Sequence, residues 1–205
     1  MFKLQHAIGN LFRDYLESKG FIEIHSPKLQ GAATESGASV FKVNYFKGKT
    51  ASHYSHSVAD VFYTGSAFLA QSPQLAKQMA IAADFERVYE IGPVFRAEDS
   101  NTHRHMTEFI GLDLEMAFEE HYHEVMEMLD GLFIHIFRGL REKYKNEIET
   151  VRRQFPADEF KWREGPEGTL KLTFKEASDL LVADGVQREP LDDIECVQLS
   201  NLVHN

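Results

Sequence analysis

A pair of extended runs joined by a polar segment constrains the fold more than any other feature of the sequence. The runs cover residues 87–96 and 106–118, and the polar segment covers residues 97–105. In the second run large apolar residues alternate with polar or small ones, as in a strand whose two faces have different surroundings. We therefore predict a long antiparallel hairpin with a large loop.

Helical patterns lie on both sides of this hairpin. Apolar residues recur at helical spacing over residues 4–15, and Gly20 provides a C-terminal stop. A second apolar stripe over residues 125–140 predicts a long amphipathic helix. Shorter helices are predicted after capping residues, at residues 73–84, with Pro73 in the first turn, and 174–184.

Short strands complete the pattern, at residues 21–25, 40–46 and 169–172. No internal repeat or low-complexity linker marks a second complete domain, and residues 190–205 show no clear pattern. These observations predict one α+β domain in which helices flank an antiparallel sheet.

Composition excludes several classes of protein. The formal charge of −10 argues against a generally basic surface that coats nucleic acid. A single cysteine, Cys196, excludes an internal disulfide framework and a multi-cysteine zinc site. No apolar run approaches the roughly 20 residues that span a bilayer, and no signal-peptide pattern follows Met1, so a soluble intracellular protein is expected.

The second hairpin strand carries two carboxylates on one face. Alternation places Asp113 and Glu115 on the same side as Phe109, with the small residues Gly111 and Ala117 between and beyond them. Small residues leave room above a strand, so this face predicts a cavity lined by acids and an aromatic ring. A solvent-facing strand with outward carboxylates is the alternative.

The hairpin loop concentrates cationic side chains. Arg96 and Arg104 offer planar donor forks that suit phosphate or carboxylate oxygens, which predicts a nucleotide site; a solvated turn with internal ion pairs is the alternative. His103 and His105 lack a third ligand, so no metal site is predicted.

A further polar pair opens the helix that begins at Pro73. Gln74 and Lys77 lie one helical turn apart, so their amide and ammonium groups can converge on one anionic ligand, although an exposed helix start has the same pattern. The Gly48-Lys49-Thr50 run does not complete a phosphate-binding P-loop, because Val43 stands where the motif needs glycine.

These pieces, in this order, resemble a known family. Residues 91–109, Ile-Gly-Pro-Val-Phe-Arg-Ala-Glu-Asp-Ser-Asn-Thr-His-Arg-His followed by Met-Thr-Glu-Phe, are similar to motif 2 of the class II aminoacyl-tRNA synthetases, and residues 20–27 are similar to motif 1. The residues around Arg96 and at positions 71–77 resemble the aspartyl-tRNA synthetases of eukaryotic and archaeal type more than the asparaginyl and lysyl enzymes.

The resemblance implies an aspartate-tRNA ligase, which activates L-aspartate with ATP to aspartyl-adenylate and transfers it to tRNA-Asp in protein biosynthesis. It also implies a cytoplasmic homodimer without membrane attachment that uses Mg²⁺. The alternative is a non-catalytic truncated paralogue or fragment that binds adenylate ligands or a protein partner.

The resemblance also assigns roles to individual residues. The catalytic residue would be Arg96, between the ATP α-phosphate and the aspartate carboxylate. The ATP-binding set would be Arg96, Glu98, Arg104, His105, Met106 and Phe109. The aspartate-binding set would be Glu35, Gln74, Lys77, Arg96 and Asp113. Ser100, Thr102 and Glu108 would lie near the tRNA acceptor end, and Pro27 at the dimer interface.

The sequence departs from the family pattern in three respects. The anticodon-binding domain and the C-terminal motif 3, which carries an ATP-clamping arginine and the residues that hold Mg²⁺, are absent from it, so residues 1–189 are expected to form a partial catalytic domain. Residues 48–65 are an insertion, either a tolerated surface loop or a retained intron, and we favour the intron. Ser36 also replaces a glycine of the family, which is expected to stiffen the loop around it.

Overall fold

The computed structural model describes residues 1–34, 39–44, 66–97, 106–159, 161–162, 164–165 and 168–185. The chain forms two compact units: one is Ile8–Val125, and the other combines Met1–Ala7 with Met126–Asn205. The predicted insertion at 48–65 and the tail at 190–205 lie outside the described residues.

The predicted hairpin organises the unit Ile8–Val125. Strand β5 (Arg87–Phe95) pairs antiparallel with β6 (Glu108–Met116) along its whole length, and Gly92 lies opposite Gly111. Strand β1 (Ile22–Glu23) adds to the other edge of β5 in parallel, so the order is β1-β5-β6. The hairpin is confirmed, while the strand predicted at 21–25 is shorter than expected.

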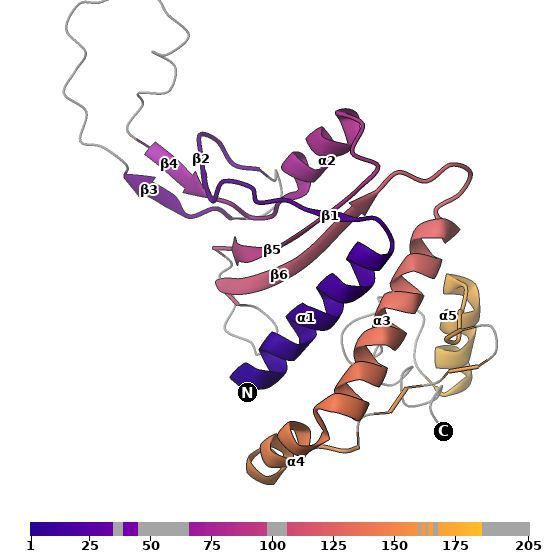
Figure 1. The fold of residues 1–205 in the computed structure, drawn as a ribbon. Coiled ribbons are helices and arrows are strands. Elements are labelled where there is room, and N and C mark those ends of the chain that lie inside the picture. The colour runs from indigo at the N-terminus through magenta and orange to yellow at the C-terminus, as the bar shows by residue number, and fades with distance from the viewer. Residues whose placement is uncertain are drawn as a thin grey trace, which may run out of the picture. The chain divides into compact units, whose positions relative to one another are not determined.

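A second sheet has the order β2-β4-β3 (Figure 1). Strands β2 (Leu29–Gln30) and β3 (Lys42–Asn44) each pair antiparallel with β4 (Ser66–Leu69). The strand predicted at residues 40–46 is thus present over its central part. The last two predicted residues lie outside the described part of the chain.

Helices α1 (Phe2–Ser18) and α2 (Gln74–Ala82) lie on opposite sides of the hairpin (Figure 1). From the α1 side, Phe12 packs edge-on against Tyr89 of β5 with ring centroids 5.7 Å apart, and both residues are buried. The predicted stop is confirmed, since Gly20 has a φ of +81°, which favours a residue without a Cβ.

The second unit is largely helical. Helix α3 (His123–Lys143) begins in the first unit and confirms the predicted apolar stripe, and α4 (Lys145–Gln154) was not predicted. Helix α5 (Phe174–Ala183) is confirmed and begins with a reciprocal capping box between Thr173 and Glu176.

The strand predicted at 169–172 is wrong. Thr169 donates its backbone N–H and its hydroxyl to the carboxylate of Asp130, at 3.2 and 2.6 Å, instead of joining a sheet. The only pairing near it within the described residues is an isolated bridge between Gly165 and Gly168. A side-chain partner on α3 has therefore replaced the strand partner that this run needs.

The fold class is confirmed as α+β, with antiparallel sheets accompanied by helices. Strands β2 and β4 and the parallel β1–β5 pairing are features of the described topology that the sequence did not indicate. None of the described helices has the length and apolar character needed to cross a bilayer.

Candidate functional site

The predicted acidic face lies where α2 meets the hairpin. Glu90 lies opposite Asp113 and Val94 lies opposite Phe109 in the register, so their side chains share one face of the sheet. A Cβ on Gly111 would lie 2.9 Å from Asp113 Oδ2, so the glycine leaves room for that carboxylate to lean along the sheet. The cavity expected above this face stays a prediction.

Lys77 of α2 supplies the charge that this face requires. The residue is 2% exposed. Its ammonium group contacts Asp113 Oδ1 at 3.2 Å and Glu115 Oε2 at 3.3 Å, and donates to the carbonyl oxygen of Leu114 at 3.1 Å. Burying an ammonium is unfavourable unless counter-charges and hydrogen-bond acceptors accompany it, and here all its donors have acceptors.

Gln74 converges on the same place, as its spacing from Lys77 predicts. Its side-chain amide donates to Glu115 Oε2 at 3.1 Å, so amide and ammonium share one carboxylate oxygen. The start of α2 permits this arrangement, because Ser72 Oγ accepts from the Gln74 backbone N–H at 3.3 Å. An acid of β6 thus occupies the position where the sequence predicted an anionic ligand.

Arg96 lies at the other end of the face, directly after β5. Its backbone N–H donates to the Thr107 carbonyl oxygen at 3.0 Å, which fixes the base of the side chain. Its guanidinium group stacks on the Phe109 ring, with Cζ 5.6 Å from the ring centroid. Its Nε is buried and has no hydrogen-bond partner within the described residues. A buried donor without a partner is costly, and an anionic ligand would satisfy it.

A second acid–lysine pair on this face was not predicted from the sequence. Glu90 is 2% exposed, forms an ion pair with Lys28, and accepts from the Ser26 backbone N–H at 3.0 Å. The available signal was a single acid inside the otherwise uncharged run from Val88 to Phe95. Its partner is 62 residues away along the chain, so no local pattern could identify it.

The remaining predicted residues are placed only in part. Met106 and Glu108 are exposed near the start of β6, and Pro27 is exposed after β1. The other predicted positions lie outside the described residues: Glu35, Glu98, Ser100, Thr102, Arg104 and His105. Among the residues that the structure describes, no three His, Cys, Asp or Glu side chains form a group that could hold a metal ion.

Comparisons with known proteins identify the family of this chain. The family model of the class II tRNA synthetases (D, K and N) matches residues 1–195. The cytoplasmic aspartate–tRNA ligase of Homo sapiens is 52% identical over 194 residues, which are 95% of this chain and 35% of that protein. The chain therefore spans about a third of the length of this curated relative.

Solved structures show the same relationship. An aspartyl-tRNA synthetase from Entamoeba histolytica matches with a TM-score of 0.72 and 36% identity over 98% of this chain and 34% of its own. An asparaginyl-tRNA synthetase from Pyrococcus horikoshii, solved with asparaginyl-adenylate, matches with a TM-score of 0.71 and 28% identity over 98% of this chain and 42% of its own. The acid–lysine face, the motif around Arg96 and these matches together place the chain in the class II tRNA synthetase family for aspartate, lysine and asparagine.

Proposed function

We propose that this chain forms part of the active site of an aspartate–tRNA ligase. The observation that carries the proposal is the buried Lys77 ammonium, held by Asp113 and Glu115 at the α2 end of the hairpin face. An ammonium group suits the side-chain carboxylate of L-aspartate better than the neutral amide of asparagine. Relatives with the aspartate–tRNA ligase name support the same substrate.

The proposed reaction has two steps. The α-carboxylate of L-aspartate attacks the α-phosphorus of ATP, forming aspartyl-adenylate and releasing pyrophosphate. The 3′-terminal ribose hydroxyl of tRNA-Asp then attacks the activated carbonyl, and AMP leaves. Both steps demand correct positioning of the reactants and neutralisation of the charge that develops on oxygen.

The described residues fit defined parts of this reaction. Arg96 would contact the α-phosphate and the attacking carboxylate, where its Nε, which has no hydrogen-bond partner among the described residues, would gain an acceptor. Phe109 would stack on adenine, with Met106 beside the nucleotide. Gln74 and Asp113 would orient the substrate and its ammonium group.

The other assignments are also proposals. Glu35 would contact aspartate, Glu98, Arg104 and His105 would contact ATP, and Ser100, Thr102 and Glu108 would lie near the tRNA acceptor end. Mg²⁺ is implied by the family, but the described residues include no group suited to hold it, so no step is assigned to the ion. By analogy with the named relatives we place the protein in the cytoplasm.

Aspartate-dependent exchange of pyrophosphate into ATP tests the proposal directly. We expect exchange with L-aspartate, and the longest product of the gene should be assayed beside the 205-residue chain. Absence of exchange in both proteins contradicts the ligase assignment. Exchange by the longer product alone would show that the chain contributes only part of a working site.

A further inference from the structure

Glu90 is a buried acid that the proposed chemistry does not use. It points from the middle of β5 onto the same face as Asp113, its register partner on β6. Directly opposite residues in an antiparallel pair have Cβ atoms about 4.5–5.5 Å apart. A carboxyl group at 2% exposure therefore adjoins the proposed aspartate site.

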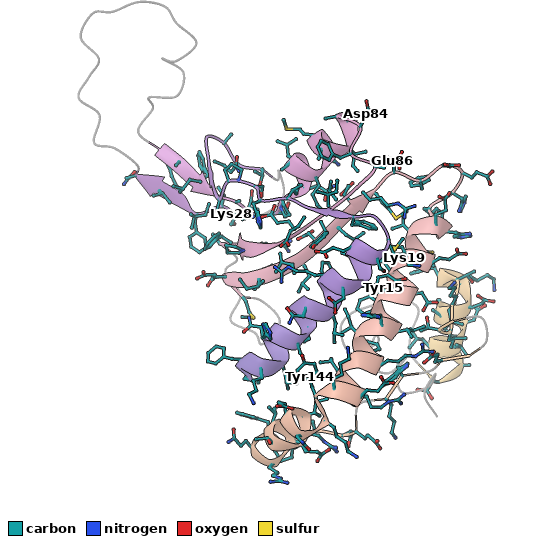
Figure 2. All side chains as sticks on the ribbon, viewed as in Figure 1. Tyr15, Lys19, Lys28, Asp84, Glu86 and Tyr144 are labelled. Atoms are coloured by element: carbon teal, nitrogen blue, oxygen red, sulfur yellow. The ribbon has the colours of Figure 1, made fainter. Side chains whose placement is uncertain are left out.

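The counter-charge of Glu90 is Lys28, from the segment that joins β1 to β2 (Figure 2). Its ammonium group donates to Glu90 and, at 3.1 Å, to Ser26 Oγ. An ammonium has three donors, and these are its two acceptors within the described residues. The Lys28 side chain is 23% exposed, whereas the Lys77 side chain is 3% exposed.

Gly92 brings this lysine onto the site face. A Cβ at Gly92 would lie 2.9 Å from Glu90 Oε1 and 3.3 Å from both Cε and Nζ of Lys28. The Lys28 ammonium therefore lies over Gly92, which has no side chain to exclude it. Gly111, the partner of Gly92 across the hairpin, leaves room for Asp113 for the same reason. Two lysines from different elements thus approach one pair of facing acids.

We propose that Lys28 is a second specificity-determining lysine of the aspartate site, and that Glu90 holds it in place and limits its positive field. The inference rests on the proposed function. Lys77 is already shared between two carboxylates, so an additional cation nearby favours an anionic amino-acid side chain over a neutral one. Lys28 acts through the electrostatic field that it adds to the site, and Glu90 is a positioning residue for Lys28.

Two substitutions distinguish this proposal from a purely structural ion pair by the direction in which each changes aspartate affinity. Lys28→Met makes the face more negative by one charge, and Glu90→Gln makes it more positive by one charge while an amide oxygen can still accept from the Ser26 N–H. Loss of a structural pair would weaken substrate binding in both variants. A field effect would change aspartate affinity in opposite directions.

The test is calorimetric titration of L-aspartate and L-asparagine into the 205-residue chain and its variants. We expect Lys28→Met to weaken aspartate binding at least about fivefold and Glu90→Gln to strengthen it, with asparagine binding changed much less. The double variant should return towards the parent. Shifts of the same sign in both single variants, or equal shifts for both amino acids, would overturn the inference.

The matched control is Glu23→Gln, which removes the carboxylate of the Arg13–Glu23 ion pair at β1. It should lower stability and leave the ratio of aspartate to asparagine affinity unchanged. If the parent chain binds neither amino acid, the titration is made with the longest gene product, and absence of binding there contradicts the proposed function. A ligand-free double-mutant cycle in urea then decides the inference: Lys28→Met and Asp113→Asn should be non-additive, and strict additivity would overturn it.

Discussion

Lys77 shows how one buried residue can serve both stability and recognition. Its ammonium group compensates two acids that retain 33% and 26% of their side-chain exposure. Those acids can be rehydrated when a ligand carboxylate competes for the lysine. A lysine held by fully buried acids would be less available, because its partners would remain as uncompensated charges.

Replacing Lys77 with methionine tests this dual role. We expect Lys77→Met to raise the KM for aspartate far more than the KM for ATP, because only aspartate would lose its counter-charge. The free energy of unfolding should fall by about 1–2 kcal/mol, since both acids keep contact with water. Pyrophosphate exchange and urea unfolding measure the two effects.

The matched control for this lysine is Lys175→Met, at an exposed pair with Asp179 on α5. It should change neither KM. Equal increases of both KM values in Lys77→Met would point to a structural role alone.

Arg96 is tested in the same assay. Arg96→Ala in the complete enzyme should lower the exchange rate by at least about 10²-fold, or about 3 kcal/mol of transition-state stabilisation, because a preorganised cation next to the reacting phosphate is lost. Arg87→Ala is the control, because Arg87 also stacks on a phenylalanine, Phe21, outside the site. Unchanged exchange in Arg96→Ala would reject the assignment.

Residue positions were predictable where a single strand or helix carries the signal. Alternation along residues 108–116 placed Asp113 and Glu115 together, and one helical turn brought Gln74 and Lys77 onto Glu115. The Lys28–Glu90 pair was not predictable, because its partners come from distant segments that meet only after the hairpin has formed.

At the scale of elements, a charged network joins α1, β1 and β5. Arg13 donates two hydrogen bonds to the Glu23 carboxylate, both at 3.0 Å, and the Tyr89 hydroxyl donates to Glu17 at 3.0 Å. The hydrogen bond from Arg13 lowers the pKa of Glu23. Burial, followed by the hydrogen bond to Glu17, raises the pKa of Tyr89.

These shifts predict loss of stability at both ends of the pH range. Glu23 favours its charged form when folded, so its contribution is present above the unfolded pKa of about 4.3 and is lost as the pH falls. Tyr89 favours its neutral form when folded, so stability is lost as the pH rises beyond the unfolded pKa of about 10. Urea midpoints across the pH range measure both limbs of the curve of stability against pH, the acid limb and the alkaline limb.

Two variants assign the limbs to their residues. Glu23→Gln should mainly reduce the loss of stability at acid pH, and Tyr89→Phe the loss at alkaline pH. Each variant should also change the other loss slightly, because the Tyr89 hydroxyl donates to Glu23 at 3.3 Å. Unaltered slopes in either variant would show that another group controls that limb.

The elements themselves were predicted best where a pattern is long or capped. The hairpin, α1, α3 and α5 follow from periodicity, and the Thr173–Glu176 box marks the start of α5. The run at 169–172 has strand composition, but the backbone N–H and the hydroxyl of Thr169 donate to Asp130 of α3 instead of to a neighbouring strand. Local composition cannot reveal a partner that lies 39 residues away.

At the scale of the whole molecule, the surface near Pro27 predicts self-association. Ile22 and Leu29 lie near Pro27 along the chain and are 51% and 48% exposed, although both are apolar. A two-fold contact through this surface would remove them from water, as the homodimer of the family implies. We expect sedimentation at tens of micromolar to show dimers.

Substitution at this surface tests the contact. Ile22→Asp should shift the chain to monomer, because a charge would then face its own copy across the two-fold axis. Phe155→Asp, at an exposed apolar residue away from Pro27 along the chain, is the control and should leave the dimer intact. A compact monomer in the parent chain would contradict a retained interface.

The family includes aspartate, lysine and asparagine enzymes, so the amino acid that this chain binds distinguishes among them. Calorimetric titration of L-aspartate, L-asparagine and L-lysine into the purified chain tests it most directly. The buried Lys77 predicts saturable binding of L-aspartate at least about tenfold tighter than that of either other amino acid, a difference of about 1.4 kcal/mol. Equal or tighter binding of L-asparagine or L-lysine would contradict the assignment of aspartate as the substrate.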